Sequence, residues 1–234
     1  MTAPVSSTAS VGRPSGPTVS LLVTFALGNE SRPFRKVVGR RADVAILETG
    51  VGPANAQAAL QRALAILRPR WVITSGFAGA LDPKLACGTV VFEADEELGV
   101  ARQLLASGAV AARFHCATRI AVTVAEKQAL RATTGMDAVE MESQVIRALC
   151  RERGIPSATV RVISDAADEE LPLDFNQVLD ADLRLSPIKL AGALARSPGQ
   201  LAGLVRFEGR VRAAARKLAQ ALAALTAEQP VGPR

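Results

Sequence analysis

The strongest constraint on the fold of this chain is an alternation between short apolar segments and segments with helical spacing. After Pro53, for example, Leu60, Leu64 and Leu67 recur on one helical face, and Pro69 ends the helix that this spacing predicts. Seven apolar runs have the length of strands: residues 19–27, 43–47, 71–75, 89–92, 120–124, 138–141 and 158–163. This alternation is typical of α/β proteins. It predicts a three-layer α/β/α fold with a mixed, mainly parallel central sheet.

Composition divides the 234 residues into three parts. Residues 1–18 are rich in Ser, Thr, Pro and Gly and are predicted to form a disordered leader. Residues 19–182 contain the alternating segments and form the predicted catalytic domain. Residues 183–234 are rich in Ala, Leu and Arg, with breaks at Pro187 and at residues 197–199. This last part is predicted to be a basic helical extension packed on the same domain.

The positive charge of the chain belongs to this extension. Residues 183–234 hold nine Lys and Arg against two Asp and Glu, whereas the whole chain has a net charge of +6. Aromatic residues make up only 3% of the chain, which disfavours nucleic acid as a partner because few rings are present to stack on bases. A solvated helix face or an acidic partner explains the charge, and contact of the tail with a membrane surface stays open.

Cysteine and histidine content narrows the chemistry further. The three cysteines have no CxxC spacing, which excludes a disulfide framework or a zinc knuckle and favours a reducing, cytoplasmic location. The single histidine, His115, gives little support to a zinc site or a Ser-His-Asp triad, so we expect no metal.

Polar residues follow several of the predicted strands. Ligands of parallel sheets bind beyond the carboxyl ends of the strands, which makes these residues the candidates for a site: Glu30, the glycine-bearing turn 75–79, Glu140, Glu142, Ser164 and Asp165. Each alone has a structural alternative, such as a helix start for Glu142 or a turn for Asp165. Arg161 lies inside an apolar strand and needs a partner, either Glu30 or a carboxylate of a ligand.

Two sequence runs, AVEMES and VRVISDAAD, resemble the nucleoside phosphorylase/nucleosidase superfamily, and FALGNE and SGFAGALDPKLACGTVVF add to the likeness. The resemblance covers about residues 21–175 and is closest to methylthioadenosine/S-adenosylhomocysteine nucleosidases. It implies a nucleoside phosphorylase-like fold and an enzyme that hydrolyses the glycosidic bond of a purine nucleoside, a 5′-substituted adenosine. It also implies a homodimer and no cofactor.

The resemblance implies a role for each matching residue. Asp165, supported by Ser164, would be the general acid that protonates N7 of the purine. Glu142 would accept hydrogen bonds from the ribose hydroxyls, and Met141 would pack on the sugar. Glu30, with Arg161 nearby, would hold and deprotonate the attacking water. The remaining expected contacts with substrate are Gly76, Phe77 and Val124.

Phe77 stands where the resemblance leads us to expect a serine. This difference affects two alternatives to the nucleosidase. A phenyl ring offers no hydrogen bond to phosphate, which weakens a phosphorylase with an anion site at Arg32, Arg35 or Arg40. A nucleoside-binding protein whose nucleophile pocket is closed by Phe77 is the second alternative. The tail resembles that of hopanoid-associated phosphorylase-like proteins, which act on an adenosyl group carried by a lipid, although an ordinary amphipathic helix explains it too.

Overall fold

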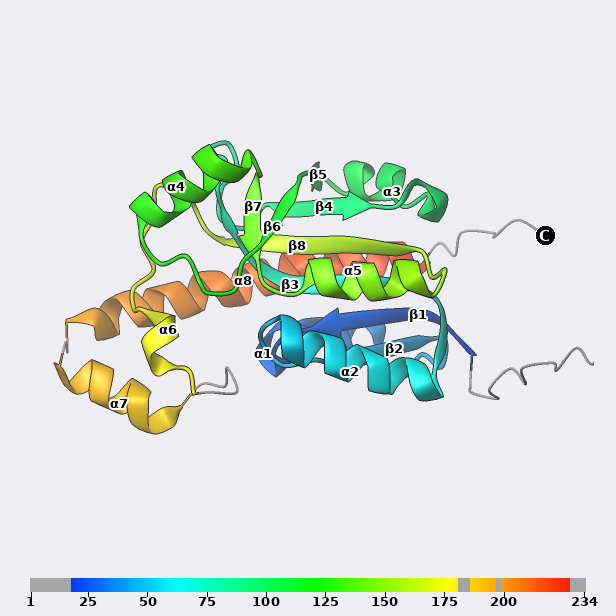
Figure 1. Ribbon diagram of the computed structural model, residues 1–234, viewed down its shortest axis with the longest axis horizontal. Helices are drawn as coiled ribbons and strands as arrows, with labels where there is room; N and C mark the ends of the chain where they lie inside the picture. The colour runs from blue at the N-terminus through cyan, green and yellow to red at the C-terminus, as the bar shows by residue number, and fades with distance from the viewer. Residues whose placement is uncertain (1–17, 181–185, 197–198, 228–234) are drawn as a thin grey trace, which may run out of the picture.

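The computed structural model describes residues 18–180, 186–196 and 199–227, and shows one mixed sheet between two layers of helices (Figure 1). The sheet order is β2-β1-β3-β8-β4-β5, with β7 pairing β3 and β6 pairing β7. The strands are β1 Thr18–Phe25, β2 Val44–Glu48, β3 Arg68–Ala80, β4 Val90–Ala94, β5 Val110–Ala111, β6 Phe114–Cys116, β7 Ala138–Glu140 and β8 Ser157–Asp165. β2, β1, β3 and β8 run parallel, and β4 joins β8 antiparallel. The expected fold class is confirmed.

The helices that cover the sheet divide between its two faces, and others lie beside it (Figure 1). Their bounds are α1 Gly28–Val38, α2 Pro53–Ile66, α3 Ala101–Ala106, α4 Val124–Thr134, α5 Ser143–Glu152, α6 Phe175–Val178, α7 Pro187–Arg196 and α8 Gln200–Ala227, with a 3-10 turn at Glu96–Leu98. Alternate side chains of β1 show the division. Leu21 and Val23 pack in a cluster with residues of α1, α3 and α8, whereas Leu22 packs with residues of α2 and α5. This alternation is the period of a strand buried on both faces.

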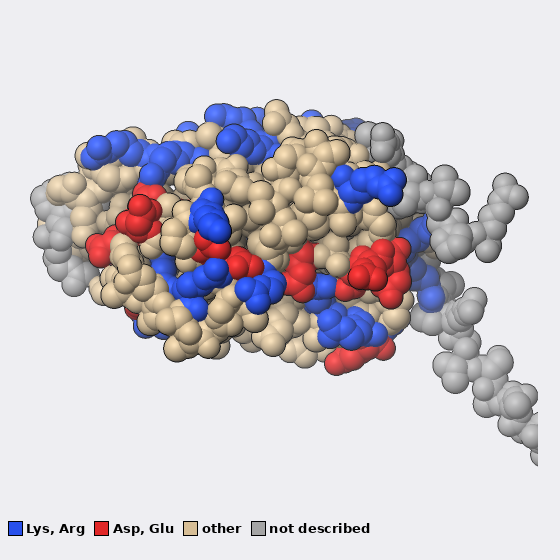
Figure 2. All heavy atoms as spheres, turned by 90° about the horizontal axis from the view of Figure 1, so that it is seen from above, with Lys and Arg blue, Asp and Glu red and all other residues tan. Residues whose placement is uncertain are grey.

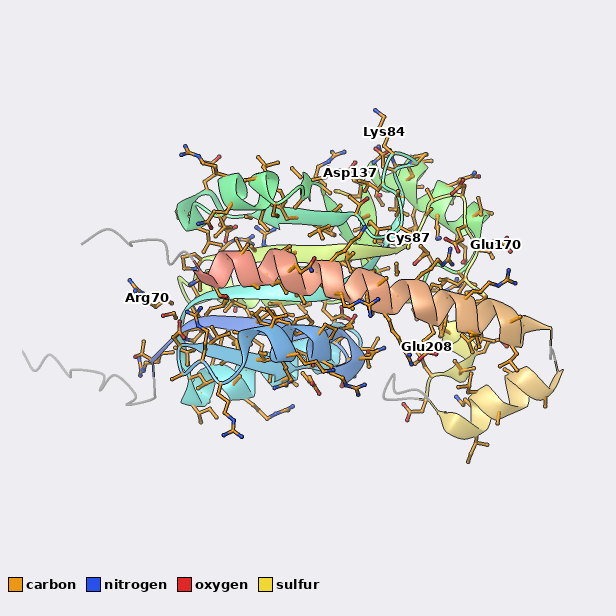
Figure 3. All side chains as sticks on the ribbon, turned by 180° about the vertical axis from the view of Figure 1, so that it is seen from behind. Arg70, Lys84, Cys87, Asp137, Glu170 and Glu208 are labelled. Carbon is orange, nitrogen blue, oxygen red and sulfur yellow. The ribbon has the colours of Figure 1, made fainter. Side chains whose placement is uncertain are left out.

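The helix α8 covers the sheet along much of its length (Figure 3). Ala214, Leu218 and Leu222 recur at helical spacing, are buried, and pack against β-strand residues in the largest core cluster. Part of the predicted extension therefore belongs to the core. The predicted leader lies almost wholly outside the described residues. Within those residues, no helix is long and apolar enough to cross a bilayer.

Two local predictions were wrong. The glycine-bearing stretch 76–79 does not end its strand, because β3 continues to Ala80 with Gly76 at φ +138° and a register shift between Ala78 and Gly79. The glycine conformation and the shift let β3 bend while it stays paired to β8. Residues 120–124 do not form a strand either. Thr123 accepts a hydrogen bond from the backbone N–H of Glu126, and this capping box starts α4 at Val124.

The first helix was not anticipated. α1 begins at Gly28, so that Glu30 lies in the first turn of a helix instead of a loop. The sequence of α1 is predominantly polar, and Phe34 is its only large apolar residue that is buried. A helix with so narrow an apolar face gives a weak periodic signal.

Candidate functional site

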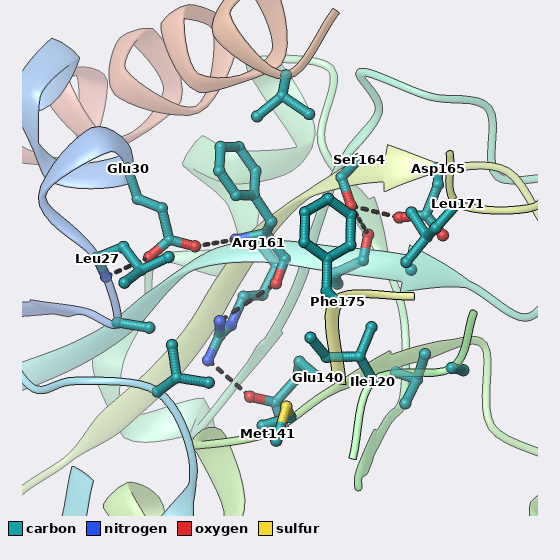
Figure 4. A pocket seen from close by; sticks show the side chains of 18 of the residues that line it. Leu27, Glu30, Ile120, Glu140, Met141, Arg161, Ser164, Asp165, Leu171 and Phe175 are labelled. Atoms are coloured by element: carbon teal, nitrogen blue, oxygen red, sulfur yellow. Dashed lines mark hydrogen bonds and ion pairs between the residues drawn. The ribbon is translucent and has the colours of Figure 1, made fainter. Parts of the chain in front are cut away.

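A cavity of about 270 Å³ opens where the carboxyl ends of β1, β3 and β8 come together (Figure 4). Among the predicted residues that line it are Glu30, Phe77, Met141, Glu142, Arg161, Ser164 and Asp165. Three acidic side chains that are far apart in the sequence therefore surround one space. Figure 4 shows Glu30 on one side of the cavity and Ser164 with Asp165 on the other. Glu30 and Asp165 converge because β1 and β8 run parallel and their carboxyl ends share one edge of the sheet. Glu142 reaches the same space from β7, which pairs antiparallel to β3.

Arg161 forms the centre of a buried charged cluster. Its side chain is 2% exposed, and its Nη2 atom donates to Glu140 Oε2 at 2.6 Å and to Glu142 Oε2 at 3.1 Å. The expected partner was Glu30 or a carboxylate of a ligand. The structure shows that the glutamates on either side of Met141 pair with the guanidinium instead, and so satisfy a charge that would be very costly alone.

Glu140 holds the turn that presents Glu142. Its Oε2 atom accepts from the backbone N–H groups of Glu142 and Ser143, both at 2.8 Å, and its Oε1 atom accepts from the Ser143 hydroxyl at 2.6 Å. A carboxylate in this place also interacts favourably with the N-terminus of α5. No role for Glu140 was predicted, because the sequence pattern gives no indication of which of the two glutamates faces a ligand.

Glu142 faces the cavity from the start of α5. The backbone N–H of Gly52 donates to its Oε1 atom at 2.9 Å, while Oε2 accepts from Arg161. Burial raises the pKa of Glu142, and Arg161 acts in the opposite direction.

Glu30 is held at its place by two backbone amides. Leu27 N–H donates to Oε2 at 2.9 Å and Phe77 N–H donates to Oε1 at 3.0 Å. Burial raises the pKa of Glu30 from 4.5 to about 7, with Arg161 lowering it and Glu142 raising it further. A carboxyl group with such a pKa exchanges its proton near neutral pH.

Gly76 leaves room for the side chain of Glu30. It was predicted to contact the substrate, but it is not part of the cavity lining. A Cβ atom at this position would lie 2.7 Å from Glu30 Oε1 and 3.0 Å from Arg161 Nη1. The missing side chain therefore leaves room for the carboxylate. The ring of the neighbouring Phe77 does line the cavity.

Asp165 has a partner at each of its carboxyl oxygens. The Ser164 hydroxyl donates to Oδ1 at 2.5 Å, and Lys127 Nζ lies 2.6 Å from Oδ2. Burial raises the pKa of Asp165, and the Lys127 ammonium opposes this shift. Lys127 was not predicted. It comes from α4, and no local pattern indicates that a lysine of this polar helix reaches the end of β8.

Apart from Asn29 and Arg119, the remaining walls of the cavity are mainly apolar. Residues from several connections and from α8 line it: Leu27, Val51, Ile120, Ala121, Leu171, Phe175, Phe207 and Val211. Val124 does not line it, because α4 begins there and Ile120 and Ala121 occupy the wall instead. Sequence reasoning also missed Phe207 and Val211, which lie on the helical extension.

The extension is fastened to this wall by ring and charge contacts. The Phe175 and Phe207 rings have centroids 6.0 Å apart, and the Arg210 guanidinium lies 5.9 Å from the centroid of Phe207. Arg210 also forms an ion pair with Glu169 in the segment that follows β8. The helix α8 thus contributes to the cavity as well as to the core.

Comparisons with known proteins show which family and which fold this chain resembles. The model of the phosphorylase superfamily matches residues 18–96 and 106–189. The 5′-methylthioadenosine/S-adenosylhomocysteine nucleosidase of Glaesserella parasuis is 28% identical over 170 residues, which are 58% of this chain and 74% of that protein. The corresponding enzyme of Actinobacillus succinogenes is 28% identical over 185 residues, 65% of this chain and 80% of that protein.

Solved structures share the fold. Futalosine hydrolase of Helicobacter pylori has a TM-score of 0.64 at 13% identity, covering 89% of this chain and 97% of that one. The 5′-methylthioadenosine/S-adenosylhomocysteine nucleosidase of the same organism, with butyl-thio-DADMe-Immucillin-A, has a TM-score of 0.63 at 14% identity, covering 90% and 98%.

Proposed function

Because this chain belongs to the phosphorylase superfamily, we propose that it is a purine nucleosidase that hydrolyses the glycosidic bond of a 5′-substituted adenosine. The nucleosidases that it resembles over most of their length support this reaction. The observation that carries the proposal is the placement of Glu30, Glu142 and Asp165 around one cavity.

At the base end, Asp165 protonates N7 of the purine while the bond from C1′ to N9 breaks. Burial raises the pKa of its carboxyl group, so the proton is retained to a higher pH than in an exposed aspartate. The Ser164 hydroxyl and the Lys127 ammonium orient the two oxygens. Protonation turns the purine into a neutral leaving group.

At the sugar end, Glu142 accepts hydrogen bonds from the two ribose hydroxyls, and Met141 packs against the apolar face of the ring. Positive charge develops on the sugar as the bond to the base stretches, as in other glycoside cleavages. The carboxylates around Arg161 outnumber its single positive charge. The resulting negative field stabilises the positive charge that develops on the sugar.

Glu30 activates the attacking water. With its pKa near 7, it accepts a proton from water as the water oxygen bonds to C1′. The two backbone N–H groups that donate to Glu30 fix its orientation before the substrate arrives. The products are adenine, with the proton from Asp165, and the free sugar.

Phe77 favours water over phosphate in this reaction. Its backbone N–H already donates to Glu30, and its ring occupies the cavity wall. Arg32, Arg35 and Arg40, the expected anion site of a phosphorylase, are absent from the cavity lining within the described residues, and Arg35 pairs with Glu48. Hydrolysis is therefore proposed in preference to phosphorolysis.

The experiment that tests the proposal measures adenine release from 5′-methylthioadenosine, adenosine and inosine, with and without phosphate. We expect turnover without phosphate and a free sugar as product. A rate that requires phosphate and gives a sugar 1-phosphate would replace hydrolysis with phosphorolysis. Tight binding of all three without turnover would identify a nucleoside-binding protein instead.

We further propose a homodimer, because the members of the superfamily that the sequence resembles complete their pockets with a neighbouring chain. Light scattering of the purified protein tests this, and a monomer at assay concentration would contradict it. The three free cysteines support a cytoplasmic location. The face in Figure 2 mixes positive and negative side chains, which supports the absence of nucleic acid among the partners.

We also propose that the tail contacts a membrane surface. Ile188, Leu201 and Val205 on α7 and α8 are exposed, which supports it. Sedimentation with anionic liposomes tests it, and protein that stays in solution would contradict it. The resemblance of the tail to hopanoid-associated proteins stays a prediction.

A further inference from the structure

Lys127 is a fully buried lysine whose ammonium contacts three oxygen atoms. It is 1% exposed, and Nζ donates to the carbonyl oxygens of Ala166 at 2.7 Å and Glu169 at 2.6 Å while it lies 2.6 Å from Asp165 Oδ2. Three acceptors match the three N–H bonds of an ammonium group. The site is therefore complete for a charged lysine.

The folding of α4 gives no reason for a charge at this place. Burying a lysine costs desolvation and side-chain entropy, which an apolar side chain of similar length would avoid. The N-terminus of α4 is already capped by Thr123 and Glu126. The contacts of Lys127 are directed instead at Asp165 and at the segment that follows it.

We propose that Lys127 is a positioning residue for the general acid, because its ammonium holds the Asp165 carboxyl group against Ser164 and ties both to the cavity wall. This inference rests on the role of Asp165 in the proposed function. With Oδ2 held by Lys127 and Oδ1 by Ser164, rotation of the carboxyl group is restrained from both sides.

The two contacts of Lys127 with backbone carbonyl groups extend this restraint to the apolar wall of the cavity. Ala166 and Glu169 lie between Asp165 and Leu171, a residue of the apolar lining. Glu169 is in turn paired with Arg210 of α8. One ammonium thus connects α4, the acid and the segment that α8 covers.

The charge of Lys127 also affects the pH at which Asp165 loses its proton. Lys127 lowers the pKa of Asp165, against the effect of burial. The other charged or titratable groups that act on Asp165 are Glu169 from the following segment, Cys87 from the loop before β4, and Arg210 from α8. Lys127 is the only one of these that forms an ion pair with Asp165 in the described part of the chain.

The test is the pH profile of kcat/KM for adenine release by Lys127→Met in the full chain. Loss of a cation in contact raises the pKa of the acid, so its alkaline limb should move up by about 1 unit or more. Looser positioning should lower kcat at pH 7 roughly 10- to 100-fold with a smaller change in KM. Lys127→Arg should restore the position of the limb, because it keeps the charge.

Lys84→Met is the matched control, since it removes the same charge from an exposed side chain (Figure 3). It should leave both the profile and kcat unchanged. A folded Lys127→Met enzyme with the wild-type limb and kcat would overturn the inference. If Lys127→Met does not fold, as judged by circular dichroism, Lys127→Gln is measured in the same way.

A double-mutant cycle separates this inference from the proposed function. In the Asp165→Asn background, Lys127→Met should cause little further loss of kcat, because the group through which it acts is gone. A full additive loss would show that Lys127 acts elsewhere. Wild-type turnover by Asp165→Asn alone would instead contradict the acid role itself, whatever Lys127 does.

Discussion

Two buried charged clusters form along β8, one at Arg161 in the middle of the strand and one at Asp165 at its end, and they differ in the balance of their charges. At Arg161, one guanidinium faces the carboxylates of Glu140 and Glu142, and Glu30 interacts with it electrostatically. At Asp165, one carboxyl group faces one ammonium, that of Lys127. The first cluster has a surplus of carboxylates, and the second is matched.

The difference in balance corresponds to two chemical tasks. A surplus of carboxylates favours positive charge nearby, which suits the sugar end of a stretching glycosidic bond. At Asp165, burial raises the pKa of the carboxyl group so that it can hold a proton, while the Lys127 ammonium opposes this shift and fixes the position of the group. The same strand supplies both environments because the partners come from different elements: β7 and the start of α5 for Arg161, and α4 for Asp165.

The largest effect is expected from the matched cluster. Asp165→Asn removes the proton donor and should lower kcat roughly 10²- to 10⁴-fold, with a smaller change in KM. Adenine release under saturating substrate measures it. Asp168→Asn, an exposed neighbour, should keep wild-type turnover. If both variants are equally active, the matched cluster is not the base end of the site.

The balance of the two clusters predicts unequal losses of stability. Arg161→Met leaves Glu140 and Glu142 buried together without their cation, and should lower the free energy of unfolding by about 3–5 kcal/mol. Lys127→Met leaves a single carboxyl group that stays neutral by binding a proton, so its loss should be smaller. Urea unfolding of both variants at pH 7 compares them, and equal losses would break the comparison.

The pH dependence of stability tests the burial of Glu30 beside the Arg161 cluster, because burial is the main cause that raises the pKa of Glu30. Its pKa is raised from 4.5 to about 7, so the folded protein binds this proton more tightly than the unfolded chain does. The resulting stability is present below pH 4.5 and is lost as the pH rises to 7, by at most about 3 kcal/mol. Glu30→Gln should remove that dependence in urea unfolding between pH 4.5 and 7.

Glu48→Gln is the control for this measurement, because the pKa of Glu48 is lowered, chiefly by the hydrogen bond from Ser31. Its contribution has the opposite sign, since stability from Glu48 is lost as the pH falls. An unchanged slope in Glu30→Gln would mean that folding does not raise the pKa of Glu30.

The smallest effect is expected where the matched cluster is fastened to α8. Arg210 and Glu169 form a partly exposed ion pair, and such pairs contribute about 0–1 kcal/mol. Arg210→Gln should therefore lower stability by less than about 1 kcal/mol in urea unfolding. A loss as large as that of Lys127→Met would show that α8 is as important to the base end as α4.

Local patterns predicted most strands and the acidic residues at their ends. The runs at β1, β2, β3 and β8 were apolar and correctly placed, although their bounds differ by several residues. Glu30 and Asp165 could be selected because the carboxyl ends of parallel strands converge, whereas Glu142 follows β7, which pairs antiparallel to β3. The same reasoning also selected Gly76 and Val124, which are not among the residues that line the cavity. A glycine inside a strand and an apolar residue after a capping Thr both resemble other local structures.

The sequence by itself determined the class of the fold and the acidic character of the site, because strand periodicity and the residues after each strand are local properties. Only the tertiary structure decided how the buried charges pair: Arg161 with Glu140 and Glu142, and Asp165 with Lys127. Ion pairing depends on which elements meet in space. No local sequence pattern links two residues that are distant in the chain, so their contact forms only when the sheet and its helices pack together.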